Sequence, residues 1–195
     1  MATKILCAIA GPNGSGKTTV IGELHSKGLL TEEFITPDEV VREQKYLGIK
    51  DETERYLSAM RDAELVRNVL LERGISFSFE TVFSHPSKVD FILKAKQLGY
   101  FIDLIYVATL DPAINIDRVA RRVSQGGHDV PVDKILSRWH KSFENVKSIL
   151  NIVDQFRFID NSGDFPEVVA IMTNGSVMIT EKFIGTCWDT LIGDF

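Results

Sequence analysis

The residues best suited to chemistry form one glycine-rich stretch near the start of the chain, Gly11-Pro12-Asn13-Gly14-Ser15-Gly16-Lys17-Thr18, which is followed by Thr19. It matches the phosphate-binding pattern G-x-x-x-x-G-K-[ST] at every fixed position. Glycines let the backbone turn tightly, so that successive N–H groups and the start of the next helix face one anion. Lys17 would then reach the β- and γ-phosphates and Thr18 would ligate Mg²⁺. The stretch therefore predicts a site for ATP and Mg²⁺, against the alternative of a turn that binds nothing.

Acidic residues follow two further strand-like runs. Asp38 lies within Thr36-Pro37-Asp38-Glu39, which has the T-x-x-E form of a helix capping box. Glu80 and Thr81 lie just beyond the run at residues 75–79. Because ligands bind at the carboxyl ends of strands in open α/β sheets, these groups could contact a substrate. The alternatives are an acid favoured by the helix dipole at Asp38 and a cap of the next segment at Glu80.

A basic helix face is the third candidate. Asp111-Pro112 predicts a helix start. The apolar residues that follow share one face at i, i+3, i+4 and i+7 and are Ile116, Val119, Ala120 and Val123. Arg118, Arg121 and Arg122 then fall on the other face. Phosphoryl transfer needs cations around the transferring group, so this face could bind phosphate, and a solvated basic face is the alternative.

The segment at about 112–131 is predicted to be a lid. Gly126-Gly127 breaks the helix and could act as a hinge, and His128 could contact a ligand or fix that hinge. A longer helix is predicted from Pro131. In it, Arg138 heads a polar row that continues with Ser142 and Asn145, away from an apolar stripe that includes Val132, Ile135, Leu136 and Trp139. Arg138 is therefore a fourth candidate cation for the site.

Strand-like and helical stretches alternate along the chain. Strands are predicted at residues 5–10, 34–35, 75–79, 101–109 and 156–160, with helices between them. Asn174-Gly175 joins two further runs, 168–172 and 176–180, in the strongest short hairpin pattern. The expected fold class is α/β: a P-loop kinase-like parallel sheet with helices on both faces, and a C-terminal β-hairpin that covers a sheet edge.

Composition limits the class of protein. The 195 residues are 44% hydrophobic with no linker-like shift, which favours one domain over residues 1–195. A net charge of −5 argues against a nucleic-acid partner. Cys7 and Cys187 are too few for a disulfide framework or a zinc site, and no run approaches the ~18 apolar residues of a membrane span, so a cytoplasmic protein is expected.

Three protein classes use such a loop. A transport-type ATPase needs a signature sequence that Ser124-Gln125-Gly126-Gly127 matches only superficially, and a GTPase needs an N-K-x-D motif whose lysine is missing from Asn151-Ile152-Val153-Asp154. A small-molecule kinase needs the loop, a mobile basic lid and an acidic group near the acceptor hydroxyl. The chain has candidates for all three parts, which favours the kinase.

The same elements resemble those of the zeta toxin family of P-loop kinases, over about residues 4–160. The matching segments are Gly11 to Thr19, Pro37-Asp38, Phe79-Glu80-Thr81, Arg118 to Arg122 with Gly126-Gly127-His128, and Arg138. The Gly-Gly-His form of the lid resembles a compact branch often described as predicted ATPases.

The resemblance implies roles for these residues. Studied members of the family phosphorylate UDP-N-acetylglucosamine. By analogy, Asp38 would take the proton of the acceptor hydroxyl, Glu80 and Thr81 would hold the acceptor, and arginines of the lid would steady the γ-phosphate. A toxin of this kind would also have an antitoxin protein as a partner.

The leading hypothesis is an ATP- and Mg²⁺-dependent kinase that acts on a hydroxyl of a small acceptor such as a nucleotide sugar. The alternatives are a kinase of another metabolite or of a nucleic-acid end, and an NTP-binding switch or toxin component with secondary ATPase activity. Asp111 and Asp160 each follow a strand and are further candidates to support Mg²⁺.

Overall fold

The computed structural model describes residues 3–41, 48–173 and 175–189. Its centre is a seven-stranded sheet in the order β2-β3-β1-β4-β5-β6-β7. The strands are β1 (Ile5–Ala10), β2 (Glu33–Ile35), β3 (Phe77–Thr81), β4 (Phe101–Ala108), β5 (Gln155–Asp160), β6 (Glu167–Thr173) and β7 (Ser176–Ile179). The first five strands pair in parallel, and β6 and β7 add antiparallel strands at one edge. The expected α/β class and the terminal hairpin strands are therefore confirmed, with Asn174 of the turn outside the described residues.

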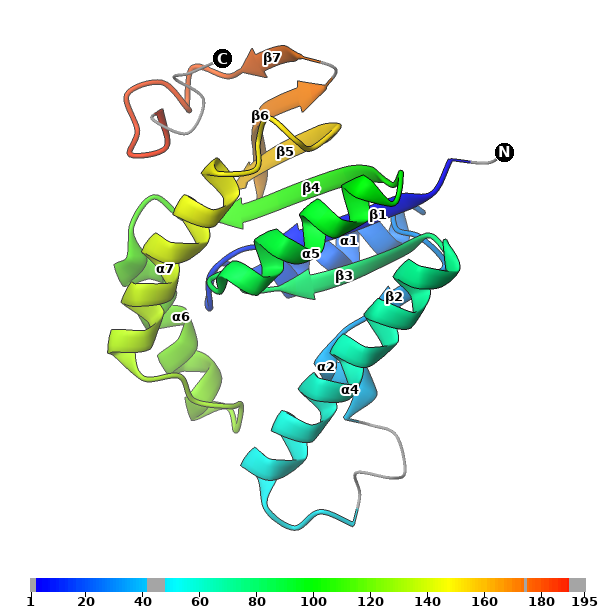
Figure 1. Cartoon of the computed structure of the whole chain (residues 1–195). Coiled ribbons are helices and arrows are strands. Elements are labelled where there is room, and N and C mark those ends of the chain that lie inside the picture. Colours follow the sequence, from blue (N-terminus) through cyan, green and yellow to red (C-terminus); the bar gives the residue numbers. More distant parts are fainter. Residues whose placement is uncertain (1–2, 42–47, 174, 190–195) are drawn as a thin grey trace.

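Helices connect the parallel strands. They are α1 (Lys17–Ser26), α2 (Pro37–Val40), α4 (Glu52–Arg73), α5 (Pro86–Gln97), α6 (Pro112–Ser124) and α7 (Val132–Lys147). Figure 1 shows α5 on the opposite side of the sheet from α1, and α6 and α7 together beyond the ends of the central strands. This arrangement leaves the carboxyl ends of β1, β3 and β4 facing the space between α7 and α4.

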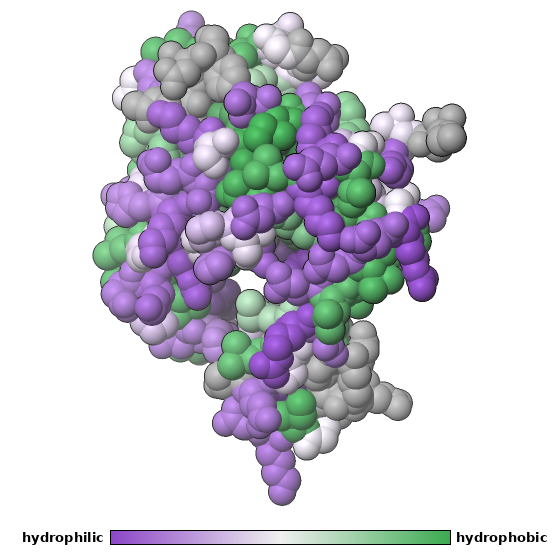
Figure 2. All heavy atoms as spheres, viewed as in Figure 1, coloured by the Kyte–Doolittle hydropathy of each residue, from purple (hydrophilic) through white to green (hydrophobic). Residues whose placement is uncertain are grey.

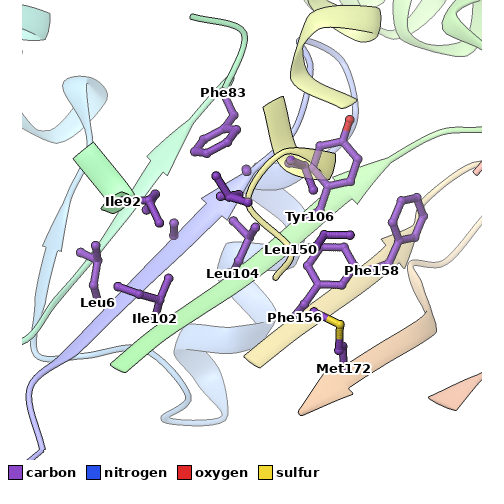
Figure 3. Close-up of a cluster of buried hydrophobic side chains, with 14 of the residues drawn as sticks. Leu6, Phe83, Ile92, Ile102, Leu104, Tyr106, Leu150, Phe156, Phe158 and Met172 are labelled. Carbon is purple, nitrogen blue, oxygen red and sulfur yellow. The ribbon is translucent and has the colours of Figure 1, made fainter. Parts of the chain in front are cut away.

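Two apolar layers hold the helices against the sheet. The larger cluster combines alternate residues of β1, β3, β4 and β5 with inner residues of α5 and α7, and Figure 3 shows its packing around Leu104 and Tyr106. The smaller cluster packs Val20 and Leu24 of α1 against Ile9 and Val107 on the other face. Because β4 is buried on both faces, it forms a near-continuous apolar run, as central parallel strands do.

Several helix ends follow the sequence signals. Gly74 ends α4 in the left-handed conformation with φ 69°, and Asp111 caps α6 by accepting a hydrogen bond from the backbone N of Ala113 at 2.8 Å. His85 caps α5 through a side chain that accepts from the N of Ser87 at 3.2 Å, so it has a structural role. The sequence also predicts a break near Gly48 in the helical stretch from about Val40 to Arg73, but residues 42–47 lie outside the described part of the structure.

Two local predictions were wrong. Glu80 and Thr81 do not lie beyond β3 but are its last two residues, because they pair with Ile9 and Ala10 of β1. The predicted apolar stripe of α7 is also incomplete: Val132 and Leu136 are exposed, since the first turn of α7 packs only through Ile135 on Val119 of α6 and on Val130.

The polar row of α7 points into the protein. Ser142 is fully buried and its hydroxyl lies 2.9 Å from that of Tyr106. Asn145 donates to the carbonyl of Phe83 at 2.9 Å. These bonds give partners to groups that would otherwise be buried without one, and they hold α7 beside the strand ends.

Candidate functional site

The glycine-rich loop, residues 11–18, joins β1 to α1 and packs closely against its surroundings. A Cβ built on Gly14 (φ 78°) would lie 2.4 Å from the carbonyl oxygen of Asn115, and one on Gly16 (φ 86°) would lie 2.0 Å from Nδ2 of Asn161. Real Cβ atoms do not approach so closely, and a positive φ also favours glycine. The glycines therefore let two asparagines reach the loop backbone.

Lys17 is the first residue of α1 and lies under the loop. Its Nζ donates to the carbonyls of Gly11 and Pro12 at 2.9 and 3.1 Å and lies 3.5 Å from Oε1 of Glu80. The ammonium is therefore held at the loop by backbone carbonyls, beside the end of β3. Lys17 and Glu80, predicted separately as phosphate and acceptor ligands, are neighbours.

The two asparagines brace the loop from its outer side. Asn115 is fully buried in α6, donates to the carbonyl of Asn13 at 2.6 Å and accepts from the hydroxyl of Thr109. Asn161 follows β5 and donates to the carbonyl of Ser15 at 2.8 Å. These bonds take up two loop carbonyls and fix the path of the loop backbone between β1 and α1.

Two of the four predicted arginines lie at the loop. Arg138 of α7 donates to Oδ1 of Asn13 at 3.0 Å. Nη1 of Arg118 lies 3.8 Å from the position that a Cβ on Gly16 would take, and its Nη2 donates to the carbonyl of Gly163 at 3.4 Å. The structure thus places one cation against Asn13 and one beside Gly16, both residues of the loop.

The other two arginines lie away from it. Arg121 pairs with Asp117 at 2.8 Å, and both side chains are exposed. Arg122 donates to the carbonyl of His128 at 2.7 Å, within the segment predicted as a lid. Arg118 differs from them because the first half of α6 lies beside the loop, whereas the second half projects beyond the sheet (Figure 1).

His128 lies in the segment predicted as a lid and contacts α4. Its ring stacks on that of Tyr56 with centroids 5.7 Å apart. Figure 2 shows a hollow between the α6–α7 side of the molecule and the α4 side, and this ring contact spans the two sides. The segment predicted as a lid therefore contacts α4 through this ring pair.

The turn after β3 is held in an uncommon conformation. Thr81 accepts a hydrogen bond from the N of Phe83 through its hydroxyl and from the N of Gly11 through its carbonyl. Phe83 has φ 60° and is buried. A left-handed bulky residue costs of order 1–3 kcal/mol and persists where its surroundings fix it, often at functional sites. Thr81 thus ties this turn to the phosphate loop.

The backbone of Asp38 is part of α2, directly after β2, and its side chain lies outside the described part of the structure. Thr18 and Thr19 are exposed at the start of α1. The two further Mg²⁺ candidates have local partners: Asp111 caps α6, and Oδ1 of Asp160 accepts from the N of Ser162 at 2.9 Å. Neither contact involves the loop.

Two polar groups at the loop fit a phosphate ligand. Ser15 Oγ and Arg118 Nη1 are buried without a hydrogen-bond partner among the described residues. Buried polar atoms of this kind ordinarily have partners, and both belong to residues of the loop or its border. Within the same residues no cluster of three His, Cys, Asp or Glu could hold a metal ion.

We expect Asn115→Ala to lower the free energy of unfolding by about 1–3 kcal/mol, because it leaves the Thr109 hydroxyl and the Asn13 carbonyl without their partner. Urea unfolding measures this. Asn68→Ala is the matched control, since Asn68 bonds only the carbonyl of Glu64 on the surface of α4. Equal stability of the two variants would contradict the proposed bracing of the loop.

Sequence patterns alone missed Asn115, Asn161 and Phe83. Asn115 lies four residues before Val119 on the buried face of α6, so a polar residue in an apolar row was the available signal. Asn161 follows the end of β5, where the same strand-end argument that selected Glu80 applies. No sequence signal marks the left-handed backbone of Phe83.

The sheet, the loop after β1 and the flanking arginines define a P-loop kinase fold. The sequence model of the family described as zeta toxin matches residues 2–182, and the chain belongs to this family. The resemblance and the expected enzyme class, a kinase, are thereby confirmed. Membership of this family supports a P-loop kinase-type phosphotransferase or toxin.

Individual relatives are more distant. A Haemophilus influenzae protein, described as uncharacterized, is 27% identical over 131 residues, which are 66% of this chain and 88% of that protein. The crystal structure of AvrRxo1-ORF1:-ORF2 with ATP superposes with a TM-score of 0.71 at 15% identity, covering 93% of this chain and 62% of that chain. The chain therefore spans less than two thirds of the AvrRxo1 chain. The structure described for the PezAT chromosomal toxin-antitoxin system of Streptococcus pneumoniae gives 0.60 at 17% identity, with 85% and 72% covered.

No helix of the described residues is long and apolar enough to span a membrane.

Proposed function

We propose that the protein transfers the γ-phosphoryl group of ATP, with Mg²⁺, to a hydroxyl of a small acceptor, for which a nucleotide sugar such as UDP-N-acetylglucosamine is the first candidate. The observation that carries this proposal is the Nη1 atom of Arg118, which is buried beside Gly16 without a partner among the described residues, while Arg138 contacts Asn13 of the same loop. Two cations beside a phosphate-binding loop can stabilise the negative charge on a phosphoryl group during its transfer. The AvrRxo1 structure with ATP supports the choice of nucleotide.

The chemistry divides between two ends of the site. Lys17, Arg118 and Arg138 would bind the phosphates, while Asp38 would accept the proton of the acceptor hydroxyl as its oxygen bonds to the γ-phosphorus. The bond from that phosphorus to the β–γ bridging oxygen breaks, and ADP leaves. Mg²⁺, held by Thr18, would neutralise the phosphate oxygens. Glu80 and Thr81, at the end of β3 next to Lys17 and Gly11, would hold the acceptor.

We expect Arg118→Ala and Arg138→Ala each to lower kcat by roughly 10²-fold or more, because their contacts matter most when charge develops in the transition state. Arg→Lys at either position should rescue only in part, since a point charge replaces a planar fork. Steady-state kinetics measures this, with Lys141→Ala of α7, an exposed position, as the control.

Near-normal turnover in both alanine variants would contradict their role. The same assay should be run on Arg121→Ala, Arg122→Ala and His128→Ala, which stay predictions. If only those variants lose activity, the segment predicted as a lid must rearrange before transfer. The contacts of Arg118 and Arg138 with the loop would then belong to a conformation that does not carry out the reaction.

Measuring ATP consumption against sugar nucleotides, nucleosides and other metabolites tests the function itself. A kinase should consume ATP faster when its acceptor is added. An NTP-binding switch, or a toxin component with secondary ATPase activity, should hydrolyse ATP slowly and independently of any acceptor. Stimulation by a nucleic-acid end or by another metabolite alone would reassign the acceptor and keep the reaction.

An antitoxin protein is the proposed macromolecular partner. The support is family membership and the description of PezAT as a toxin-antitoxin system. We also retain the proposals of a single domain over residues 1–195 and of a cytoplasmic location.

A further inference from the structure

Arg67 occupies a position where the spacing calls for an apolar residue. Ala59, Ala63, Arg67 and Leu71 recur every four residues along α4 and so form one row on its inner face. The three apolar members are at most 1% exposed, and Arg67 is only 6% exposed. A guanidinium is thus buried inside an otherwise apolar row.

The buried guanidinium has an aromatic contact and no anionic one. Its central carbon lies 5.1 Å from the centre of the Phe79 ring. It makes no hydrogen bond or ion pair with another described residue. Glu64, one turn earlier, pairs with Lys88 instead, at 3.3 Å. Burial lowers the pKa of Arg67 and the charge of Glu64 opposes this, but arginine remains protonated in proteins. The Arg67 nitrogens are not among the fully buried side-chain atoms of the described residues that lack a partner, so water or a dissolved anion can reach them. A nearly buried charge without an anionic partner is expensive, which points to a ligand.

The position of Arg67 indicates which of the two substrates would carry the group that it binds. Phe79 lies beside Ile35, the last residue of β2, and directly precedes Glu80. Arg67 therefore lies on the inner side of α4 near the ends of β2 and β3, whereas Arg118 and Arg138 border the phosphate loop. Figure 2 shows the hollow next to the α4 side of the molecule. The group that Arg67 meets would belong to the acceptor rather than to ATP.

We propose that Arg67 is a specificity-determining residue that binds an anionic group, a phosphate or a carboxylate, on the acceptor. A planar guanidinium can donate two parallel hydrogen bonds to either group, and Phe79 fixes its plane from one side. A neutral acceptor would leave the charge unpaired, so the residue selects for acidic acceptors. This inference rests on the proposed transfer to a small acceptor.

Anion binding tests the proposal without turnover. The phosphate loop is first saturated with a non-hydrolysable ATP analogue and Mg²⁺, so that it cannot take up the probe. Inorganic pyrophosphate and citrate are then titrated by calorimetry into wild type, Arg67→Met, Arg67→Lys and Arg61→Met. Arg61 is the matched control because it is exposed on the same helix and bonds only Ser58.

Wild type and Arg61→Met should bind at least one probe, and Arg67→Met should bind it roughly 10- to 100-fold more weakly, as expected for a charge-assisted contact. Arg67→Lys should fall between them. Preference for pyrophosphate indicates a phosphate-bearing acceptor, and preference for citrate a carboxylate. Equal binding by wild type and Arg67→Met, or no binding to wild type at millimolar probe, would overturn the proposal.

Thermal unfolding separates binding from a structural role. Arg67→Met removes an unpaired buried charge and keeps an apolar stem, so its Tm should equal or exceed that of wild type. A lower Tm with unchanged anion binding would assign Arg67 only to packing on Phe79. ATP hydrolysis that does not depend on any acceptor would refute the proposed transfer reaction, but it would not change the result of the anion titration. Failure of the proposed function and failure of the Arg67 anion site can therefore be told apart.

Discussion

Lys17→Met should abolish detectable transfer and weaken ATP binding by roughly 10- to 100-fold, because a charge-assisted contact to phosphate is worth ~1.5–3 kcal/mol. Lys17 is buried at the loop, where its Nζ is held by the carbonyls of Gly11 and Pro12. Methionine keeps most of the stem and removes only the charged end. Calorimetric titration with ATP and a coupled assay for ADP measure the two effects.

Lys27→Met is the matched control, since Lys27 lies at the other end of α1 and its side chain is 64% exposed. It should leave ATP binding and turnover unchanged. In Lys17→Met, Glu80 loses its ion partner but remains 24% exposed, so water can hydrate the carboxylate and the fold should persist. Normal ATP affinity in Lys17→Met would disprove the assignment of the loop.

The phosphate loop could be predicted from sequence because its chemistry is contiguous. The glycines, Lys17 and Thr18 lie within eight residues, and the short run before them is a strand in any α/β arrangement. Helix ends such as Asp111 and Gly74 are equally local, since each satisfies backbone groups within one turn. Local signals therefore located both the fold class and one end of the site.

Contacts between distant segments could not be predicted in the same way. Asn115 reaches Asn13 across 102 positions in the chain, and this bond exists only because α6 packs beside the loop. Arg118 and Arg121 share a helical face in the sequence pattern, yet only Arg118 lies near Gly16. The helical repeat of the sequence shows which face of a helix a side chain lies on. It does not show which turns of that helix pack against another element.

The end of β3 shows the same limit. Apolar alternation suggested that the strand stopped at Phe79, but pairing with β1 continues through Glu80 and Thr81. Backbone pairing does not depend on side-chain polarity, so a strand can continue into polar residues at a site. Arg67 gives the reverse case, because its row on α4 predicts an apolar side chain and the departure from the pattern is itself the functional signal.

Asp38→Asn should lower the rate of transfer by roughly 10²- to 10⁴-fold while ATP affinity and Tm hold. Asparagine keeps the size of the side chain, but it cannot accept the proton of the acceptor hydroxyl. The position supports this role, since α2 begins directly after β2 at Pro37. Single-turnover kinetics with a saturating acceptor measures the chemical step separately from ATP binding.

Asp51→Asn is the matched control for Asp38→Asn. Asp51 caps α4 by accepting a hydrogen bond from the N of Glu54 at 2.7 Å, and asparagine caps about as well. This control should therefore retain both Tm and turnover. If Asp38→Asn instead lowers Tm and the activity per folded molecule is unchanged, the residue serves only the start of α2. The proton acceptor must then be sought at Glu80, the other carboxylate predicted at the acceptor end of the site, and Glu80→Gln should show the loss of transfer in its place.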